Sequence, residues 1–165
     1  MSEFTRDPFA KRAKPSKDTA FYADWGRAHD YCAACGRDGG IFGLSTHHIV
    51  KQGRAHEACN LLRVCISPCH DLCELLDVRG PAKYAINSRG CVERFPGELL
   101  PKITLGIALS MKLRCDPAEV DMARLQELRG SRLPEPEPIP DEFIRSFKLN
   151  RPDVIPGVHY EKEPT

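Results

Sequence analysis

The sequence lacks long apolar runs. Nowhere in its 165 residues does a stretch approach the roughly 18 consecutive apolar residues of a membrane-spanning helix. The first residues, Met1 to Pro8, carry charges without an apolar core behind them and do not resemble a signal peptide. We therefore expect a cytoplasmic protein with no membrane partner. Internal repeats and a large net charge are also lacking, and a formal charge of +1 gives only weak support for a polyanionic partner.

Cysteine, in contrast, is abundant, with eight residues. Disulfides are rare in the cytoplasm, so these cysteines need another explanation. The motif Cys32-Ala-Ala-Cys35-Gly36 is typical of a knuckle, in which two thiolates bind one tetrahedral Zn²⁺ through a tight turn. No βαβ pattern surrounds it, which argues against a redox pair. A second pair, Cys65 and Cys69, follows later, so we predict one structural zinc site.

The fourth zinc ligand stays open between two cysteines. Cys65 and Cys69 are separated by three residues rather than the commoner two. Cys73 lies one helical turn beyond Cys69 and could replace Cys65, whereas Cys59 is a weaker substitute. The other cysteines are interpreted as free, partly buried thiols: Cys91 and Cys115.

Most of the histidines lie between or beside these cysteine pairs. His47 and His48 are adjacent, and adjacent residues on a strand point to opposite faces, so one can bind a metal while the other does something else. His70 directly follows Cys69, in the opening turns of a helix expected to begin at Ser67-Pro68. His56, between them, is interpreted as an exposed loop residue.

The order of these elements resembles the HNH endonuclease family in its zinc-stapled ββα-metal form. The elements are Cys32/Cys35, His47-His48-Ile49, Asn60-Leu61 and Cys65/Cys69-His70. The resemblance covers about residues 30–76. It implies an α+β fold with a small ββα-metal (His-Me finger) core, in which the histidine pair lies on the first strand and His70 on the helix.

The resemblance also implies a role for each residue. His48 would be the general base that activates water, and Asn60 would hold that base in place. His47 and His70 would bind one catalytic divalent cation, such as Mg²⁺, Mn²⁺ or Ni²⁺. Histidine suits the base because its unperturbed pKa is about 6.5. A cation with only two protein ligands leaves positions for a phosphate oxygen and the leaving oxygen.

Basic residues near this motif are the expected phosphate contacts: Lys51, Arg54 and Arg63. The loop Lys51-Gln52-Gly53-Arg54 departs from the family pattern, because it replaces the usual proline and paired glycines. We expect this departure to affect loop shape more than chemistry.

The chain divides into four predicted segments: a flexible basic arm (1–18), a nuclease core (19–80), an accessory segment (81–132) and an acidic, proline-rich tail (133–165). A short helix is expected over residues 19–30. The accessory segment is expected to contain a small hairpin around residues 87–90, a packed helix over 103–114 and a helix from Asp116 to Gly130. The tail holds half of the prolines and is expected to be extended, with little capacity for a core.

The expected function is a metal-dependent endonuclease acting on double-stranded DNA, with a possible protein partner bound through residues 81–165. The alternative is a non-catalytic zinc-ribbon module that binds nucleic acid or supports assembly. That alternative leaves His47, His48 and Asn60 without a role.

Overall fold

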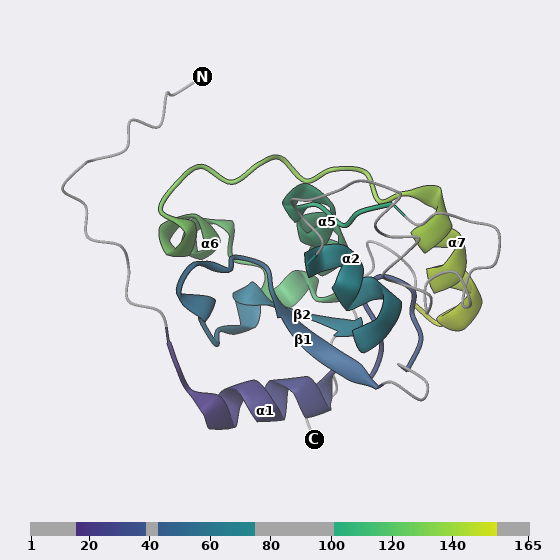
Figure 1. Cartoon of the computed structure of the whole chain (residues 1–165), viewed down its shortest axis with the longest axis horizontal. Helices are drawn as coiled ribbons and strands as arrows, with labels where there is room; N and C mark the ends of the chain where they lie inside the picture. The colour runs from purple at the N-terminus through teal and green to yellow at the C-terminus, as the bar shows by residue number, and fades with distance from the viewer. Residues whose placement is uncertain (1–15, 39–42, 75–100, 155–165) are drawn as a thin grey trace.

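The structure is a computed structural model that describes residues 16–38, 43–74 and 101–154 (Figure 1). Its helices and strands are α1 (Thr19–Ala28), β1 (Leu44–His48), β2 (Leu61–Cys65), α2 (Asp71–Glu74), α5 (Leu105–Cys115), α6 (Met122–Arg129) and α7 (Asp141–Asn150). Short 3-10 turns span Gln52–Arg54, Ala58–Asn60 and Pro117–Glu119, and a π turn spans Ile66–His70. The fold is therefore mixed α/β around a two-stranded sheet. The hairpin predicted around residues 87–90, and Cys91, lie outside the described residues.

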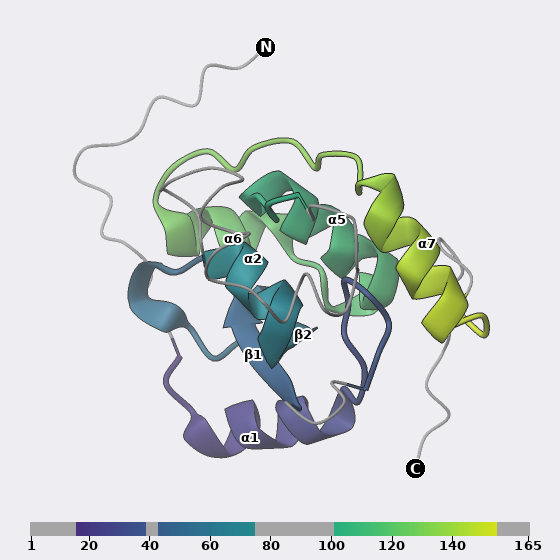
Figure 2. The same ribbon diagram turned by 45° about the vertical axis from the view of Figure 1, so that its right-hand side comes forward.

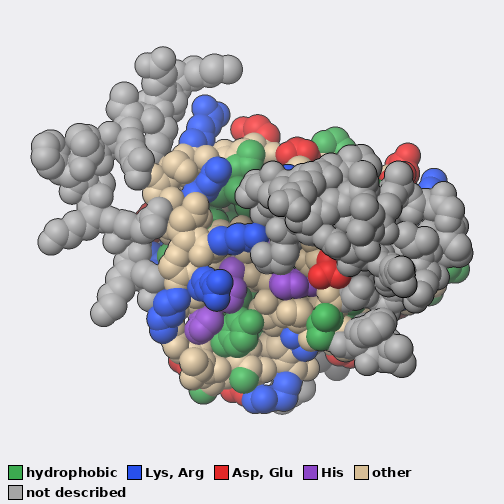
Figure 3. Space-filling view, viewed as in Figure 1, with side chains coloured by type: hydrophobic (Ala, Val, Ile, Leu, Met, Phe, Trp, Pro, Cys, Tyr) green, Lys and Arg blue, Asp and Glu red, His purple; other side chains and the backbone are tan. Residues whose placement is uncertain are grey.

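The two strands form an antiparallel hairpin at the centre of the molecule. Their register pairs Leu44 with Cys65 and His48 with Leu61. Side chains alternate along a strand, so His47 and His48 face opposite sides of the hairpin, as predicted. Helix α1 lies along one side of the hairpin, and the π turn with α2 lies on the other (Figures 1 and 2). Histidine side chains gather with Lys and Arg side chains on one face of this core (Figure 3).

Helix α1 confirms the predicted helix over residues 19–30, although it ends two residues earlier. The Asp18 side chain caps it by accepting a hydrogen bond from the Phe21 N–H at 2.9 Å. Its Trp25 is buried. Tyr22 contacts β1 through its hydroxyl, which donates to the Thr46 carbonyl at 3.3 Å, whereas Phe21 is exposed.

The helix predicted from Asp116 begins later than expected. Pro117–Glu119 forms an isolated 3-10 turn, Val120 is extended, and α6 starts at Met122 with Asp121 as its cap. Gly130 ends α6 in the left-handed region at φ 70°, as predicted. The helix does not begin at Asp116, because the Asp116 carboxylate faces His29 and makes no cap hydrogen bond, and the Glu119 carboxylate faces Lys112.

The interpretation of residues 133–165 as an extended tail is wrong for part of that segment. Residues 141–150 form α7, whose Phe143 and Phe147 are fully buried, and Leu133 before it is buried too. Two phenylalanines four residues apart lie on one face of a helix, so even a short helix can bury both against a core. The expectation of an extended tail rested on the proline content of the whole segment, whereas residues 141–150 contain no proline.

Removing the Phe143 ring tests whether α7 belongs to the core. We expect Phe143→Ala to lower the free energy of unfolding by about 3–5 kcal/mol, because it leaves a cavity in a buried site. Leu149→Ala is the matched control on the same helix, since Leu149 is 79% exposed and its truncation should cost less than about 0.5 kcal/mol. Urea denaturation measures both values. Equal costs for the two variants would contradict a packed α7.

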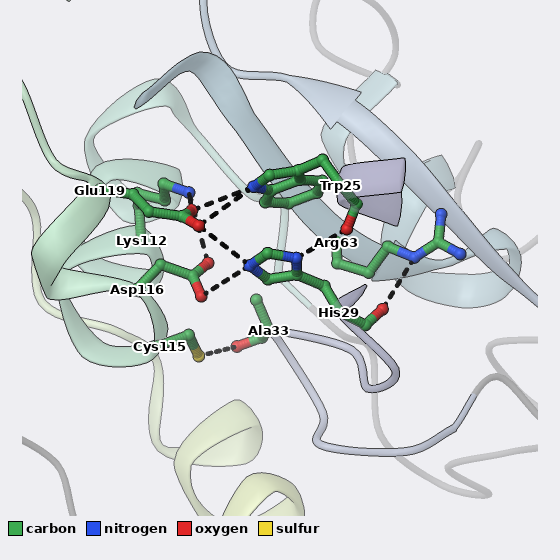
Figure 4. Close-up of polar contacts among 8 residues, drawn as sticks. All are labelled: Trp25, His29, Ala33, Arg63, Lys112, Cys115, Asp116 and Glu119. Carbon is green, nitrogen blue, oxygen red and sulfur yellow. Dashed lines mark hydrogen bonds and ion pairs between the residues drawn. The ribbon is translucent and has the colours of Figure 1, made fainter. Parts of the chain in front are cut away.

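A buried charge network joins α1 to α5 and the turn after it (Figure 4). His29 Nε2 lies 3.3 Å from an oxygen of Asp116 and 3.3 Å from an oxygen of Glu119. The Lys112 ammonium, itself 1% exposed, lies 2.6 Å from the other Glu119 oxygen and 3.3 Å from the other Asp116 oxygen. Trp25 Nε1 donates to Glu119 as well. Two cations thus balance two carboxylates, which makes burial of the group tolerable.

This network shifts the pKa values of its members. Burial lowers the pKa of His29, but its interactions with Asp116 and Glu119 outweigh that effect and raise it to about 9. Burial raises the pKa of Glu119, yet contacts with His29 and Lys112 prevail and lower it to about 2. His29 is therefore charged, and Glu119 ionised, at neutral pH.

The charge on His29 predicts a pH-dependent stability. Its contribution is complete below the unfolded pKa of about 6.5 and is lost as the pH rises through about 9. We expect the stability difference between wild type and His29→Gln to shrink by up to about 3 kcal/mol over that interval. Urea denaturation at a series of pH values measures it. A difference that stays constant from neutral to alkaline pH would show that His29 is not charged in the fold.

Candidate metal centre and active site

Four buried cysteines come together beside the hairpin. The sulfurs of Cys32, Cys35, Cys65 and Cys69 all lie within 4.8 Å of one another, and each side chain is fully buried. The Cys35 and Cys65 sulfurs are 4.0 Å apart. Sulfurs bound to one tetrahedral Zn²⁺ at about 2.3 Å are separated by roughly 3.8 Å. The group could therefore hold a metal ion such as zinc.

Local geometry explains why the first pair adopts this arrangement. The backbone N–H groups of Ala34 and Cys35 both donate to the Cys32 sulfur at 3.4 Å. The Gly36 N–H donates to the Cys32 carbonyl at 2.8 Å, and Gly36 has a φ of 77°, which favours glycine. The turn therefore directs both sulfurs of the first pair to the same side.

The C-terminal helices support this turn from outside. The Cys35 carbonyl accepts hydrogen bonds from Ser146 Oγ at 3.4 Å and Asn150 Nδ2 at 3.0 Å, both on α7. Arg114 of α5 donates to the Ala33 carbonyl. A helix of the predicted accessory segment and a helix of the predicted tail thus hold the cysteine turn in place.

The structure favours Cys65 over Cys73 as the fourth ligand. Cys65 ends β2 and belongs to the cluster, whereas Cys73 is buried on α2 and does not belong to it. Contacts with the sulfurs of Cys32, Cys35 and Cys65 raise the pKa of Cys69 well above its usual range. Four thiols this close cannot all ionise without a cation between them.

Two cysteines outside the cluster remain protonated. Burial raises the pKa of Cys59 to about 11 and that of Cys115 to about 12. Neither belongs to the four-sulfur group. They are neutral thiols at physiological pH, which agrees with the interpretation of Cys115 from the sequence and removes Cys59 as a substitute ligand.

His47 and His70 meet on one side of the hairpin. Their ring centroids are 5.7 Å apart with an angle of 76° between the ring planes. His47 comes from β1 and is 5% exposed, whereas His70 ends the π turn and directly follows Cys69. Two imidazoles that bind one cation at about 2.0–2.1 Å have ring centroids roughly 5–6 Å apart. The separation of the two rings is therefore compatible with a shared divalent cation.

His48 lies in a cluster of three rings. Its Nε2 is 3.2 Å from Nδ1 of His56, and the Tyr22 ring stacks on it at 5.6 Å with an interplanar angle of 8°. His56 is partly buried against the same tyrosine, with ring centroids 4.4 Å apart. His56 and Tyr22 are thus site residues that sequence reasoning missed. No periodicity or spacing links them to His48: the path of the loop brings His56 to it, and the packing of α1 against β1 brings Tyr22 to it.

Asn60 does not contact the His48 ring as expected. Its side chain is fully buried, where Oδ1 accepts from the Val50 N–H at 2.7 Å and Nδ2 donates to the carbonyls of Val50 and Ala55. These bonds occupy the amide and fix the loop between β1 and β2. The direct orienting role expected for Asn60 is therefore wrong, and its role is to shape the loop that carries His56.

The three basic residues expected to contact phosphate differ in their surroundings. Lys51 and Arg54 are exposed on the loop after β1. Arg63 Nε donates to the His29 carbonyl at 3.1 Å, and its Nη1 donates to Thr46 Oγ1 at 2.9 Å. Arg63 therefore ties the end of α1 to the hairpin. Lys51, His47 and Arg129 of α6 line one cavity of about 160 Å³, so Arg129 is a further cation beside the site.

Comparisons with protein-family models, curated proteins and solved structures found no match. In residues 16–38, 43–74 and 101–154, no helix has the length and apolarity needed to cross a membrane.

Proposed function

We propose that this protein is a metal-dependent DNA endonuclease of the HNH type. The observation that supports it best is the meeting of His47 and His70 next to the four-cysteine cluster, with His48 adjacent on β1. A strand and a turn supply the pair, and Cys69 restrains the turn. Two histidines that merely pack together need not lie beside a metal-binding group, whereas His70 directly follows one of the four cysteines.

The four cysteines are proposed to bind structural Zn²⁺. A segment of about 45 residues is near the lower limit for folding without a metal or disulfides. The cysteines join the first turn, the end of β2 and the π turn at one point. A bound ion would therefore fix His70 relative to the strand that carries His47.

The proposed reaction is hydrolysis of a phosphodiester bond. His48 takes a proton from the attacking water as the water oxygen forms a bond to phosphorus. The bond from phosphorus to the 3′ oxygen breaks, which leaves a 5′-phosphate and a 3′ alkoxide that takes a proton from solvent. A divalent cation such as Mg²⁺, Mn²⁺ or Ni²⁺, bound by His47 and His70, would supply charge stabilisation at the phosphate and the leaving oxygen. His48 and His47 face opposite sides of β1, so one can act on water while the other binds the ion.

Double-stranded DNA is the proposed substrate. Lys51 and Arg54 are exposed on the loop next to His48, and Arg129 lies across the cavity that His47 lines. Lys and Arg side chains lie beside the histidines on this face (Figure 3). Cations placed around a hydrolytic site suit a polyanionic backbone. A module that binds nucleic acid without cutting it would use the same cations but would leave the paired histidines without a role.

Cation-dependent cutting of supercoiled plasmid tests this proposal. We expect the zinc-loaded protein to relax or linearise the plasmid when Mg²⁺, Mn²⁺ or Ni²⁺ is added, and to stop when EDTA chelates the added cation. His70→Ala should need a higher cation concentration, because it removes one of two ligands. The absence of cutting with every cation, by protein that still binds DNA, would support the non-catalytic module instead.

A further inference from the structure

The His48 ring is contacted by two other rings from separate parts of the chain. His56 contributes Nδ1 at 3.2 Å from His48 Nε2, with the ring planes tilted by 34°. Tyr22 of α1 stacks on His48, and its hydroxyl donates to the Thr46 carbonyl at 3.3 Å. The tyrosine is thus tied to the strand that carries His48. The ring of His48 is therefore held edge-on by one histidine and on its face by one tyrosine.

The backbone around His56 is fixed from both sides. The buried amide of Asn60 binds the Ala55 carbonyl, which immediately precedes His56. The His56 N–H donates to the Ser16 carbonyl at 2.8 Å, and the Lys17 ammonium binds the carbonyls of Gly53 and Arg54. An exposed loop residue without a role would not need these restraints. These hydrogen bonds hold the backbone on both sides of His56.

We propose that His56 is the positioning residue for His48, holding the Nε2 side of its ring so that Nδ1 is the nitrogen that takes the proton from water. The inference rests on the proposed endonuclease activity. His48 Nε2–H donates to His56 Nδ1, which fixes both the tautomer and the ring orientation. When Nδ1 of His48 gains the proton, the ring becomes cationic and its hydrogen bond to His56 strengthens. The proton stays on His48 until solvent removes it, so His56 gains and loses none.

The surroundings of His56 keep it in the form that this role needs. Its pKa is lowered, first by burial and then by the charge on Lys17, with Asp18 opposing the shift. A neutral His56 can accept a hydrogen bond at Nδ1, whereas a cationic one could not and would repel a protonated His48. The sequence suggested that Asn60 holds His48 in place. We assign that role to His56 instead, and Asn60 shapes the loop that carries His56.

Three substitutions at residue 56 separate positioning from mere packing. Asparagine places an amide oxygen close to the position of Nδ1, whereas glutamine places it one carbon farther away and alanine removes the acceptor. We expect His56→Ala and His56→Gln to lower kcat for plasmid cutting by about 10- to 100-fold with KM unchanged. His56→Asn should retain kcat within a few-fold of wild type. Zinc content and circular dichroism, unchanged in all three, exclude misfolding as the cause.

NMR of isotope-labelled histidine rings provides a second readout that does not depend on activity. We expect His48 to carry its proton on Nε2 in wild type and in His56→Asn, and to lose this single tautomer in His56→Ala. Wild-type cutting by His56→Ala together with an unchanged His48 tautomer would overturn the positioning role alone. A wild-type protein that cuts no plasmid with any cation would overturn the proposed function instead, and the tautomer would still show whether His56 fixes the ring.

Discussion

Cys65→Ser is expected to lose the zinc ion and to unfold the core. Serine preserves the size of the side chain but cannot supply a thiolate to the metal. Structural zinc binds with an apparent free energy of about 10–16 kcal/mol. The free energy of unfolding of a whole small domain is of the same size, roughly 5–15 kcal/mol. Metal analysis should show less than one zinc per chain, and circular dichroism should show loss of the cooperative thermal transition.

Cys73→Ser is the matched control for that experiment. Cys73 is as buried as Cys65, at 1% exposed, but lies outside the four-sulfur group. Its hydroxyl in an apolar site should cost about 1–3 kcal/mol while leaving the zinc content unchanged. If Cys73→Ser lost the ion and Cys65→Ser kept it, the assignment of the fourth ligand would be reversed.

His48→Ala is expected to lower the rate of plasmid cutting by about 10²–10⁴-fold, the range that a general base contributes. The side chain is only partly buried and lies at the end of β1, so its removal should leave the fold intact. Zinc content should be unchanged, because His48 is not part of the cysteine cluster. Single-turnover kinetics with saturating cation measures the chemical step without contributions from product release.

Variants of the two paired histidines distinguish the base from the cation ligands. His47→Ala and His70→Ala should respond to a higher concentration of Mn²⁺, whereas His48→Ala should not. A His48→Ala protein whose activity returned at high Mn²⁺ would show that His48 acts on the cation. His29→Gln is the matched control, since it removes a buried histidine from another part of the molecule and should leave the chemical step unchanged.

Much of the core could be predicted from short sequence patterns. The Cys32-x-x-Cys35 turn, the adjacent His47 and His48 on a strand, and the Cys69-His70 step in the turn before α2 all depend on neighbours a few residues away. Local geometry determines such features, so the sequence is sufficient to place them. The α1 helix and the end of α6 at Gly130 follow from capping in the same way.

The features that the sequence could not provide depend on packing between distant segments. Phe143 and Phe147 become core residues only because α5 and the cysteine turn offer a surface to α7. The role of Asn60 depends on the path of the loop at Val50 and Ala55, which no spacing encodes. The contact between His48 and His56 follows from that same loop path.

The choice between Cys65 and Cys73 was also a question of packing. Both lie four residues from Cys69, on opposite sides of it in the sequence, so spacing alone could not separate them. Pairing of β1 with β2 places Cys65 opposite Leu44, next to the turn that holds Cys32 and Cys35. Strand register, which forms only on folding, thus selects the fourth ligand.

The most direct test of the proposed activity compares wild type with His48→Ala on one supercoiled plasmid in Mn²⁺, each protein carrying its full complement of zinc. We expect the wild type to convert the plasmid to relaxed or linear form and His48→Ala to do so at least 10²-fold more slowly. Equal rates for the two proteins, or no conversion by the wild type, would contradict the assignment of His48 as the base of an endonuclease.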